Sequence, residues 1–286
     1  MFIPRRILEE KLTQFLAEDI GQGDVTSAAI IPEGLKAEAE VTAKAEGIVA
    51  GVEEASVLAE LLGLKAKTAI ADGALAKKGR VILMLSGNAR TILSAERTLL
   101  NLLSRMSGIA TATRNLTTKI KEAGLTTRIA ATRKSAPGLL YFDKKAVLVG
   151  GGDPHRLHLD DMVLIKDNHI ALAGGLENAV KRAKQNASFS KKLEVEITKP
   201  ADAVKAAELG ADLVLLDNFQ PSQVREAVAL MKKAGLHDRV LLEASGGITS
   251  ENLLEYAEAG ADLISLGELT HSVKELDISL EISKVG

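Results

Sequence analysis

The 286-residue chain contains no cysteine and no tryptophan, and only 2% of its residues are aromatic. Without cysteine there can be no disulfides, no thiolate-ligated zinc and no thiol catalysis. So few aromatic side chains argue against a surface on which the bases of single-stranded nucleic acid could stack. The formal net charge is −2, so there is no overall basic field for nucleic acid. Any anion that this protein binds should be small and held by a local group of cations.

Segments that would target the chain to a membrane are also missing. The first residues, MFIPRRILEEKL, become a helical pattern within a few positions and lack the features of a signal peptide. No apolar run is long enough to span a bilayer. We therefore expect a soluble cytoplasmic protein, with enough residues for two domains or one large α/β domain.

The first part of the sequence mixes helical and strand patterns. Residues 7–18 and 52–62 have the apolar spacing of helices, whereas residues 35–51 alternate as a half-exposed strand does. A long amphipathic helix is predicted over residues 89–106, and the SGIAT that follows it indicates a break in the helix. We therefore expect an N-terminal α/β domain over residues 1–108.

Beyond Gly108, short β-rich runs alternate with helical segments. The predicted strands are RIAAT, MVLIK, KLEVEI, DLVLLDN, RVLLEASGG and LISLG. Such alternation predicts right-handed βαβ units and a parallel sheet. A weak repeat joins AELGADLVLL, from Ala207, to AEAGADLISL, from Ala257, and no Gly-x-Gly-x-x-Gly turn of a dinucleotide-binding sheet is present. These features favour an α/β barrel over residues 109–269.

Cations follow the first two predicted strands of this barrel. AATRK ends in Arg133 and Lys134, and MVLIK ends in Lys166. The glycine-rich GGGDPHR between them contains His155 and Arg156. Because the carboxyl ends of barrel strands meet at one rim, where barrel enzymes have their active sites, these cations suggest an anion site there.

The later strands end in residues that suit a sugar phosphate and a metal ion. Glu196 and Asp217 close the next two strands, and two carboxylates there could hold Mg²⁺. Small residues and glycines follow the last two strands, where barrels commonly bind phosphate through backbone N–H groups. They are Ser245, Gly246, Gly247, Ser265 and Gly267. The predicted ligand is a polyphosphate or a sugar phosphate.

Each of these residues also has a simpler interpretation. Arg97 has the spacing of a solvent-exposed helix residue paired with a nearby acid. Asp217 could cap a helix, Glu196 could pair with a lysine, and an isolated Ser-Gly-Gly is most often only a turn. His158 and His237 have no supporting context and are interpreted as surface or structural residues. The interpretation as a site depends on five successive strand ends that all carry such residues.

Motifs that occur along nearly the whole chain follow one another in the same order as the motifs of one known family. The motifs are EDIGQGDVTS, ERTLLNLLSRMSGIAT, TRKSAPG, GGGDPHR, DMVLIKDNHI, LEVE, LLDN and EASGGI. Together they resemble quinolinate phosphoribosyltransferase, also called carboxylating nicotinate-nucleotide pyrophosphorylase. The resemblance implies an incomplete α/β barrel of six or seven strands and a smaller N-terminal α/β hammerhead-type sandwich domain, on which residues 270–286 pack.

The resemblance also implies an activity. A member of this family is a pentosyltransferase of NAD biosynthesis that joins quinolinate to phosphoribosyl pyrophosphate and releases nicotinate mononucleotide, pyrophosphate and CO₂. Mg²⁺ is the implied cofactor, and neither nucleic acid nor membrane is an implied partner. The family's members form homodimers, in which each site is completed by the neighbouring subunit.

The family's motifs assign roles to individual residues. Arg97 would reach across the dimer to a substrate carboxylate, and Lys134 would lie near the pyrophosphate. The quinolinate pocket would comprise Arg133, His155, Arg156 and Lys166. Glu196 and Asp217 would bind Mg²⁺ and the ribose hydroxyls. The 5′-phosphate loops would comprise Ser245, Gly246, Gly247, Ser265 and Gly267. The predicted catalytic residues are Lys134, Lys166, Glu196 and Asp217.

The chain departs from the family pattern at four positions, which are Ser135, Ala136, Leu140 and Pro154. None of these changes removes a charged ligand, so they concern the detail of the pocket. Two alternatives stay open at this point: a related phosphoribosyltransferase acting on another acid such as nicotinate, and a non-catalytic metabolite-binding scaffold. The intact IKDNH motif argues against the first, and retention of the charged residues argues against the second.

Overall fold

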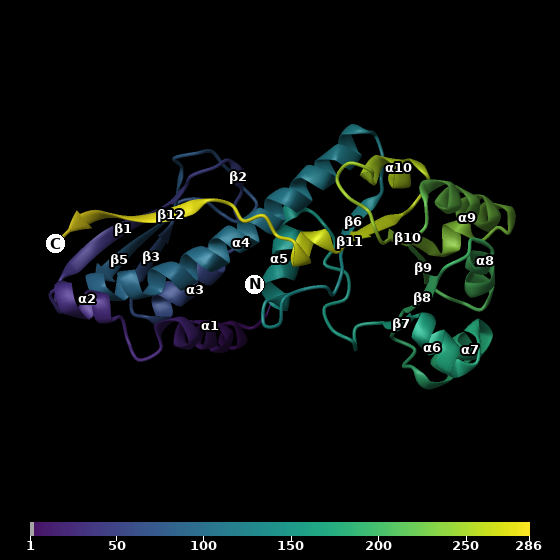
Figure 1. The fold of residues 1–286 in the computed structure, drawn as a ribbon, viewed down its shortest axis with the longest axis horizontal. Coiled ribbons are helices and arrows are strands. Elements are labelled where there is room, and N and C mark those ends of the chain that lie inside the picture. The colour runs from purple at the N-terminus through teal and green to yellow at the C-terminus, as the bar shows by residue number, and fades with distance from the viewer. Residues whose placement is uncertain (1–2) are drawn as a thin grey trace. The chain divides into compact units, whose positions relative to one another are not determined.

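The computed structural model describes residues 3–286 (Figure 1). Met1 and Phe2, at which the predicted N-terminal domain begins, lie outside the described residues. The chain forms two compact units. The first extends to Arg114 and also takes in residues 141–151 and 273–286, while the second comprises residues 115–140 and 152–272. No helix in residues 3–286 has the length and apolarity that a membrane span requires.

The first unit is built on a four-stranded antiparallel sheet in the order β12-β1-β5-β3. Its strands are β1 (Lys36–Ala43), β3 (Lys65–Thr68), β5 (Val81–Asn88) and β12 (Ile278–Val285). The smaller elements are β2 (Gly47–Ile48), β4 (Leu75–Ala76), α1 (Arg5–Ile20), α2 (Val25–Ile30), α3 (Val52–Leu61) and α5 (Leu140–Gly150). Alternate residues of β1 are buried, as the alternation in the sequence predicts. The last strand of the chain, β12, lies along β1 from one end to the other (Figure 1).

The helix α4 (Ala89–Glu122) does not break where the sequence indicated. It continues through SGIAT for about another four turns, so the prediction of a break was wrong. Gly108 lies inside the helix, and a Cβ atom there would be 2.9 Å from Cα of Glu275. This glycine is therefore required by the close approach of another segment, and it does not end the helix.

The second unit contains a six-stranded parallel sheet in the order β6-β11-β10-β9-β8-β7. Its strands are β6 (Arg128–Ala131), β7 (Val163–Ile165), β8 (Leu193–Ile197), β9 (Leu213–Asp217), β10 (Leu241–Ser245) and β11 (Leu263–Leu266). Its helices are α6 (Asp167–Ala173), α7 (Leu176–Asn186), α8 (Ala201–Glu208), α9 (Pro221–Lys233), η1 (His237–Arg239), α10 (Leu253–Glu258) and α11 (Glu268–His271). β6 and β7 are the two ends of this order, so among residues 3–286 the barrel is incomplete. The predicted incomplete α/β barrel with a smaller N-terminal domain is confirmed.

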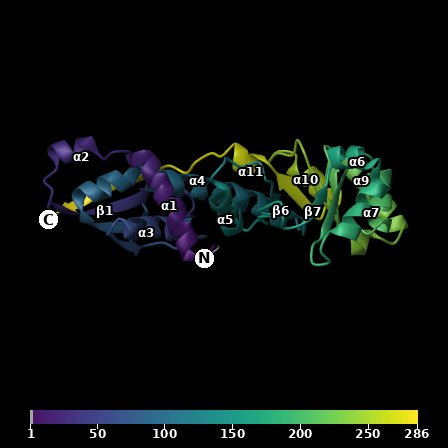
Figure 2. The same cartoon turned by 90° about the horizontal axis from the view of Figure 1, so that it is seen from below.

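The two faces of the parallel sheet differ in chemistry. Apolar residues such as Val195, Val214 and Leu242 pack against the helices in one continuous core, and Figure 2 shows α6, α7 and α9 on that outer side. Since side chains alternate along a strand, the residues between them point to the inner face of the sheet. There the sequence places carboxylates and hydroxyls, so the helix-covered face stabilises the fold and the inner face is available for a site.

The weak sequence repeat has a structural explanation. In both copies a helix ends at a glycine with positive φ, Gly210 or Gly260, and an aspartate precedes the next strand. The carboxylate of Asp212 accepts a hydrogen bond from N–H of Leu193 at 2.8 Å, and Asp262 accepts one from N–H of Leu242 at the same distance. Each aspartate therefore binds the start of the neighbouring strand and helps to set the register of the sheet.

Candidate active site

The carboxyl ends of the parallel strands carry most of the predicted site residues. Asp217 ends β9 and lies opposite Ser245 of β10, which in turn lies opposite Ser265 of β11. Glu196 is on the inner face of β8, opposite Leu215. This register brings residues from four strands to one rim of the second unit, as predicted for parallel strands.

The segments next to the outer strands β6 and β7 bring the cations to the same unit. Arg133 and Lys134 are exposed in the loop after β6, and His155 and Arg156 are partly buried in the loop that precedes β7. Lys166 follows β7 directly. Arg97 belongs to the first unit, where it is exposed on α4. The second unit thus contains every predicted site residue except Arg97.

Lys166 and Glu196 form the ion pair at the β7–β8 edge of the site. Nζ of Lys166 lies 2.8 Å from Oε2 of Glu196, with the lysine side chain 46% exposed and the glutamate side chain 10% exposed. The backbone N–H of Lys166 donates to Nδ1 of His169 at 2.9 Å. His169 of the IKDNH motif therefore caps the start of α6 and holds the backbone of Lys166 in place.

The turn after β10 is shaped by a contact that only glycine allows. Gly246 has φ +94°, and a Cβ atom there would lie 2.7 Å from Cγ of Asn218. Asn218 itself has φ +56°, and its N–H donates to the carbonyl oxygen of Ser245 at 2.8 Å. Its side-chain amide donates to Oδ2 of Asp217, also at 2.8 Å. The ends of β9 and β10 are thus joined into one structure beside the carboxylate of Asp217.

A similar contact joins the loop after β6 to the end of β11. A Cβ atom on Gly267 would lie 3.2 Å from Cδ of Lys134. The hydroxyl of Thr270 donates to the carbonyl oxygen of Lys134 at 2.7 Å. Lys134 is therefore positioned next to the glycine turn in which the sequence predicted a phosphate site.

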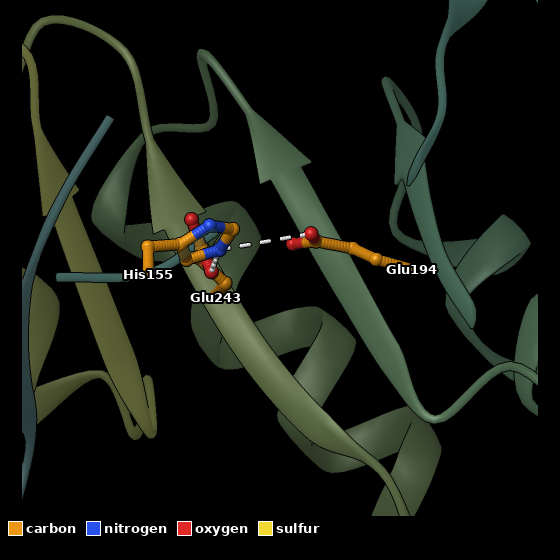
Figure 3. A group of neighbouring side chains, drawn as sticks. All are labelled: His155, Glu194 and Glu243. Carbon is orange, nitrogen blue, oxygen red and sulfur yellow. Dashed lines mark hydrogen bonds and ion pairs between the residues drawn. The ribbon is translucent and has the colours of Figure 1, made fainter. Parts of the chain in front are cut away.

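The structure adds a group that the sequence did not single out (Figure 3). Nε2 of His155 lies 3.0 Å from Oε2 of Glu243 and 3.7 Å from Oε2 of Glu194. The side chains of the two glutamates are 2% and 0% exposed, and that of the histidine is 11% exposed. We refer to these three residues as the interior cluster. Two signals in the sequence could have found it: Glu194 and Glu196 stand two apart in LEVE and so share a face, and VLLEAS has a charge inside an apolar strand.

The charges of the interior cluster follow from burial and mutual contact. Burial, and then repulsion by Glu243, raise the pKa of Glu194 to about 8. Burial alone would raise the pKa of Glu243, but the hydrogen bond and the charge of His155 lower it below its ordinary value. The two acids therefore differ in behaviour, with Glu243 the ionised partner of the histidine.

The guanidinium groups at the rim influence one another. Burial, and then the charge of Arg133, lower the pKa of Arg156. The acids Glu194, Asp161 and Glu196 act in the opposite direction. Two arginines close enough to repel each other form a favourable place for an anion, and arginine binds carboxylates in a bidentate manner.

Oxygen donors for a divalent cation are present in the same rim. Glu196 and Asp217 come from neighbouring strands, and carboxylates of this kind, together with phosphate and water, are the usual ligands of Mg²⁺. Glu196 also pairs with Lys166, which lowers the negative charge available to a cation. The donor set fits a magnesium ion that brings a phosphate ligand with it.

Comparison with known proteins identifies relatives over nearly the whole chain. Two family models match: "Quinolinate phosphoribosyl transferase, N-terminal domain" over residues 24–107 and "Quinolinate phosphoribosyl transferase, C-terminal domain" over residues 109–281. The "Probable nicotinate-nucleotide pyrophosphorylase (carboxylating)" of Methanothermobacter thermautotrophicus is 45% identical over 271 residues, which are 95% of this chain and 97% of that protein. The human nicotinate-nucleotide pyrophosphorylase (carboxylating) is 36% identical over 282 residues, covering 99% and 94%.

A solved structure agrees with the fold described above. The nicotinate-nucleotide pyrophosphorylase of Francisella tularensis superposes with a TM-score of 0.90 at 35% sequence identity. The match covers 98% of this chain and 98% of that chain. Both the antiparallel sheet of the first unit and the parallel sheet of the second are therefore shared with it.

Proposed function

The chain belongs to the quinolinate phosphoribosyltransferase family, and we propose that it transfers the phosphoribosyl group of phosphoribosyl pyrophosphate to quinolinate with loss of CO₂. The products are nicotinate mononucleotide, pyrophosphate and CO₂, in a step of NAD biosynthesis. The observation that carries this proposal is the composition of one rim of the parallel sheet. Cations for a dicarboxylate, carboxylates for a ribose, and glycine turns for a phosphate all belong to the second unit.

We assign the quinolinate pocket to the cations of that unit. Arg133 and Arg156 repel each other in the free protein, so a dicarboxylate between them relieves the repulsion as it binds. Lys166 and His155 would add further positive charge to this pocket for the two carboxylates of quinolinate. A site with this much positive charge favours quinolinate, which has two carboxylates, over nicotinate, which has one.

We assign the phosphoribosyl pyrophosphate pocket to the strand ends from β8 to β11. Glu196 and Asp217 would bind the ribose hydroxyls, and Lys134 would lie at the pyrophosphate. The 5′-phosphate would be bound at the ends of β10 and β11 and in the turns that follow them, by Ser245, Gly246, Gly247, Ser265 and Gly267. Of these, Ser265 is buried beside Glu243, so we place it behind the turn, with its neighbours nearer to the phosphate.

Mg²⁺ would be held by Glu196 and Asp217, and when bound it would supply positive charge to the pyrophosphate as that group leaves. The residues of the chain stabilise the reacting ribose and orient quinolinate. Loss of pyrophosphate leaves oxocarbenium character at C1 of the ribose, which the two carboxylates stabilise. The cations hold quinolinate so that its ring nitrogen faces C1.

Decarboxylation then follows from the chemistry of the substrate. Once the ring nitrogen bonds to C1, it is a positively charged electron sink. The bond between C2 of the ring and its carboxylate can break, with the electron pair remaining at C2 until a proton replaces the CO₂. The first step requires no general base, which agrees with a site rich in cations and carboxylates.

The experiment that tests this proposal measures nicotinate mononucleotide and CO₂ formed from quinolinate, phosphoribosyl pyrophosphate and Mg²⁺, with nicotinate as a parallel substrate. We expect both products from quinolinate only. Arg133→Ala should lower kcat/KM by about 30- to 900-fold, which corresponds to about 2–4 kcal/mol for the loss of a charged contact. Turnover of nicotinate alone, or of neither acid, would contradict the assignment.

The family resemblance also implies a dimer with shared sites, and we propose that Arg97 serves a neighbouring copy of the chain. This residue lies in the first unit and is exposed on α4. A guanidinium on that surface is available to a substrate carboxylate in a second subunit. Complementation between an Arg97 variant and a variant of the second unit would test this arrangement.

A further inference from the structure

The interior cluster contains a histidine aimed at a buried acid. Nε2 of His155 meets Oε2 of Glu243 at 3.0 Å, which is a hydrogen-bond distance (Figure 3). Glu243 lies in the middle of β10, between the fully buried Leu242 and the nearly fully buried Ala244. Barrel interiors are ordinarily filled by branched apolar side chains. A carboxylate at this position therefore calls for a partner, and His155 is that partner.

The backbone of His155 is held in an uncommon conformation that aims the ring. Its φ is +54°, in the left-handed region that non-glycine residues rarely occupy. Its N–H donates to Oδ1 of Asp153 at 2.7 Å, and Asp153 in turn pairs its backbone with β6. Such conformations persist only where the surroundings impose them, and they gather at functional sites.

The hydrogen bond to Glu243 determines what the other ring nitrogen can do. A proton on Nε2 that is directed to Glu243 leaves Nδ1 on the opposite edge of the imidazole (Figure 3). A neutral ring with its proton on Nε2 can only accept a hydrogen bond at Nδ1. A charged ring carries a proton on both nitrogens, so Nδ1 is then a donor. An anionic substrate requires a donor, so it requires the charged ring.

We propose that Glu243 is a positioning residue of the quinolinate pocket: it binds Nε2–H of His155 and keeps the imidazole charged, so that Nδ1–H is presented to a substrate carboxylate. This proposal deepens the proposed function and depends on it for the identity of the ligand. Glu243 itself contacts no substrate. It acts through His155, in the way that buried carboxylates orient other functional histidines.

The titratable and charged groups around the ring are consistent with this role. From β10 Glu243 faces the histidine, and from β8 Glu194 does so at 3.7 Å. Arg156 acts on Glu194 and is itself influenced by Arg133, Asp161 and Glu196. Of the groups that face the ring, Glu243 is the nearest anion, and its removal should therefore have the largest effect on the charge of His155.

The principal experiment compares Glu243→Gln with the unmodified protein. Glutamine keeps the size of the side chain and can still accept a hydrogen bond, but it lacks the charge. We expect the KM for quinolinate to rise by about tenfold or more near neutral pH. The KM should recover as pH is lowered, because without the Glu243 charge the imidazole of His155 is protonated only at lower pH. The KM for phosphoribosyl pyrophosphate should change little. Glu54→Gln, which neutralises a fully buried carboxylate of the first unit, is the matched control and should leave both values unchanged.

A double substitution separates positioning from a merely structural role. In a His155→Gln background, Glu243→Gln should have no further effect on the KM for quinolinate. An equal additional loss in that background would overturn the proposal. So would a folded Glu243→Gln protein whose quinolinate KM and pH dependence match those of the unmodified protein.

A further test uses the unmodified protein without ligand, so it depends neither on the folding of a variant nor on catalysis. NMR titration of isotope-labelled histidine should show the His155 ring protonated on both nitrogens at neutral pH. If the ring is instead neutral there, the proposal is wrong whatever the substrate. If the titration is as expected and quinolinate does not react, the proposed function fails while the pairing of Glu243 with His155 stands.

Discussion

Replacing Gly246 by alanine should damage the phosphate turn far more than the same change at Gly247. A Cβ atom at Gly246 would lie 2.7 Å from Cγ and 3.1 Å from N of Asn218, whereas none of the surrounding atoms comes within 4 Å of a Cβ atom at Gly247. Both glycines have positive φ, +94° and +63°. The pair therefore separates the cost of the backbone conformation from the cost of the steric overlap.

The expected magnitudes follow from these two costs. Alanine in the left-handed region costs about 1 kcal/mol, and this is the whole effect expected for Gly247→Ala. At Gly246 the overlap with Asn218 adds about 1–3 kcal/mol, because neighbouring backbone must move. For a chain of this size each kcal/mol lowers Tm by about 2–4 °C. We expect a loss of about 4–16 °C for Gly246→Ala and about 2–4 °C for Gly247→Ala.

The assay combines thermal unfolding with the KM for phosphoribosyl pyrophosphate. Gly246→Ala should raise that KM and leave the KM for quinolinate nearly unchanged, since the turn belongs to the proposed phosphate site. The double variant Gly246→Ala, Asn218→Gly lacks the side chain that the new Cβ atom overlaps, and it should recover much of the lost Tm. Equal Tm losses for the two glycine variants, or no recovery in the double variant, would refute this account of the turn.

Three further predictions concern the rest of the molecule. Lys166→Ala should lower kcat/KM for quinolinate by about 30-fold or more, and an unchanged kcat/KM would contradict this. It should also lower Tm, because the Glu196 side chain, which is only 10% exposed, loses its charged partner. Mixing inactive Arg97→Ala with inactive Lys134→Ala protein, under conditions of subunit exchange, should restore about a quarter of the activity, because half of the dimers then have one intact site; no recovery would mean that sites are not shared. Asp262→Ala leaves an N–H of β10 without its acceptor and should cost about 1–2 kcal/mol in denaturant unfolding; an unchanged midpoint would show that water replaces it.

Several parts of the fold were predictable because they depend on local patterns. Alternating strand and helix segments implied a parallel sheet, and the sheet is parallel. The repeat around Ala207 and Ala257 marked two copies of one unit, each with an aspartate that binds the neighbouring strand. The strand ends placed Glu196, Asp217 and Ser245 at one rim because all strands of such a sheet run in one direction.

The errors and omissions have a different physical origin. SGIAT contains a glycine that locally resembles a helix break, but Gly108 stays helical because another segment packs against its missing side chain. Glu243 resembled an isolated charge in an apolar strand, and only the fold reveals His155 beside it, 88 residues away in the sequence. The charge inside VLLEAS marks a buried acid, but which residue lies beside it has no local signature.

The sequence alone therefore determined the succession of strands and helices, the rim on which the charged residues gather and, through its motifs, the family. Those properties depend on periodicity and on the order of residues along one chain. The tertiary structure decided which partners meet: Lys166 with Glu196, Asn218 with Gly246, and His155 with Glu243. Those pairings depend on strand register and loop path, which are set by the packing of the whole second unit and so cannot be deduced from any one segment.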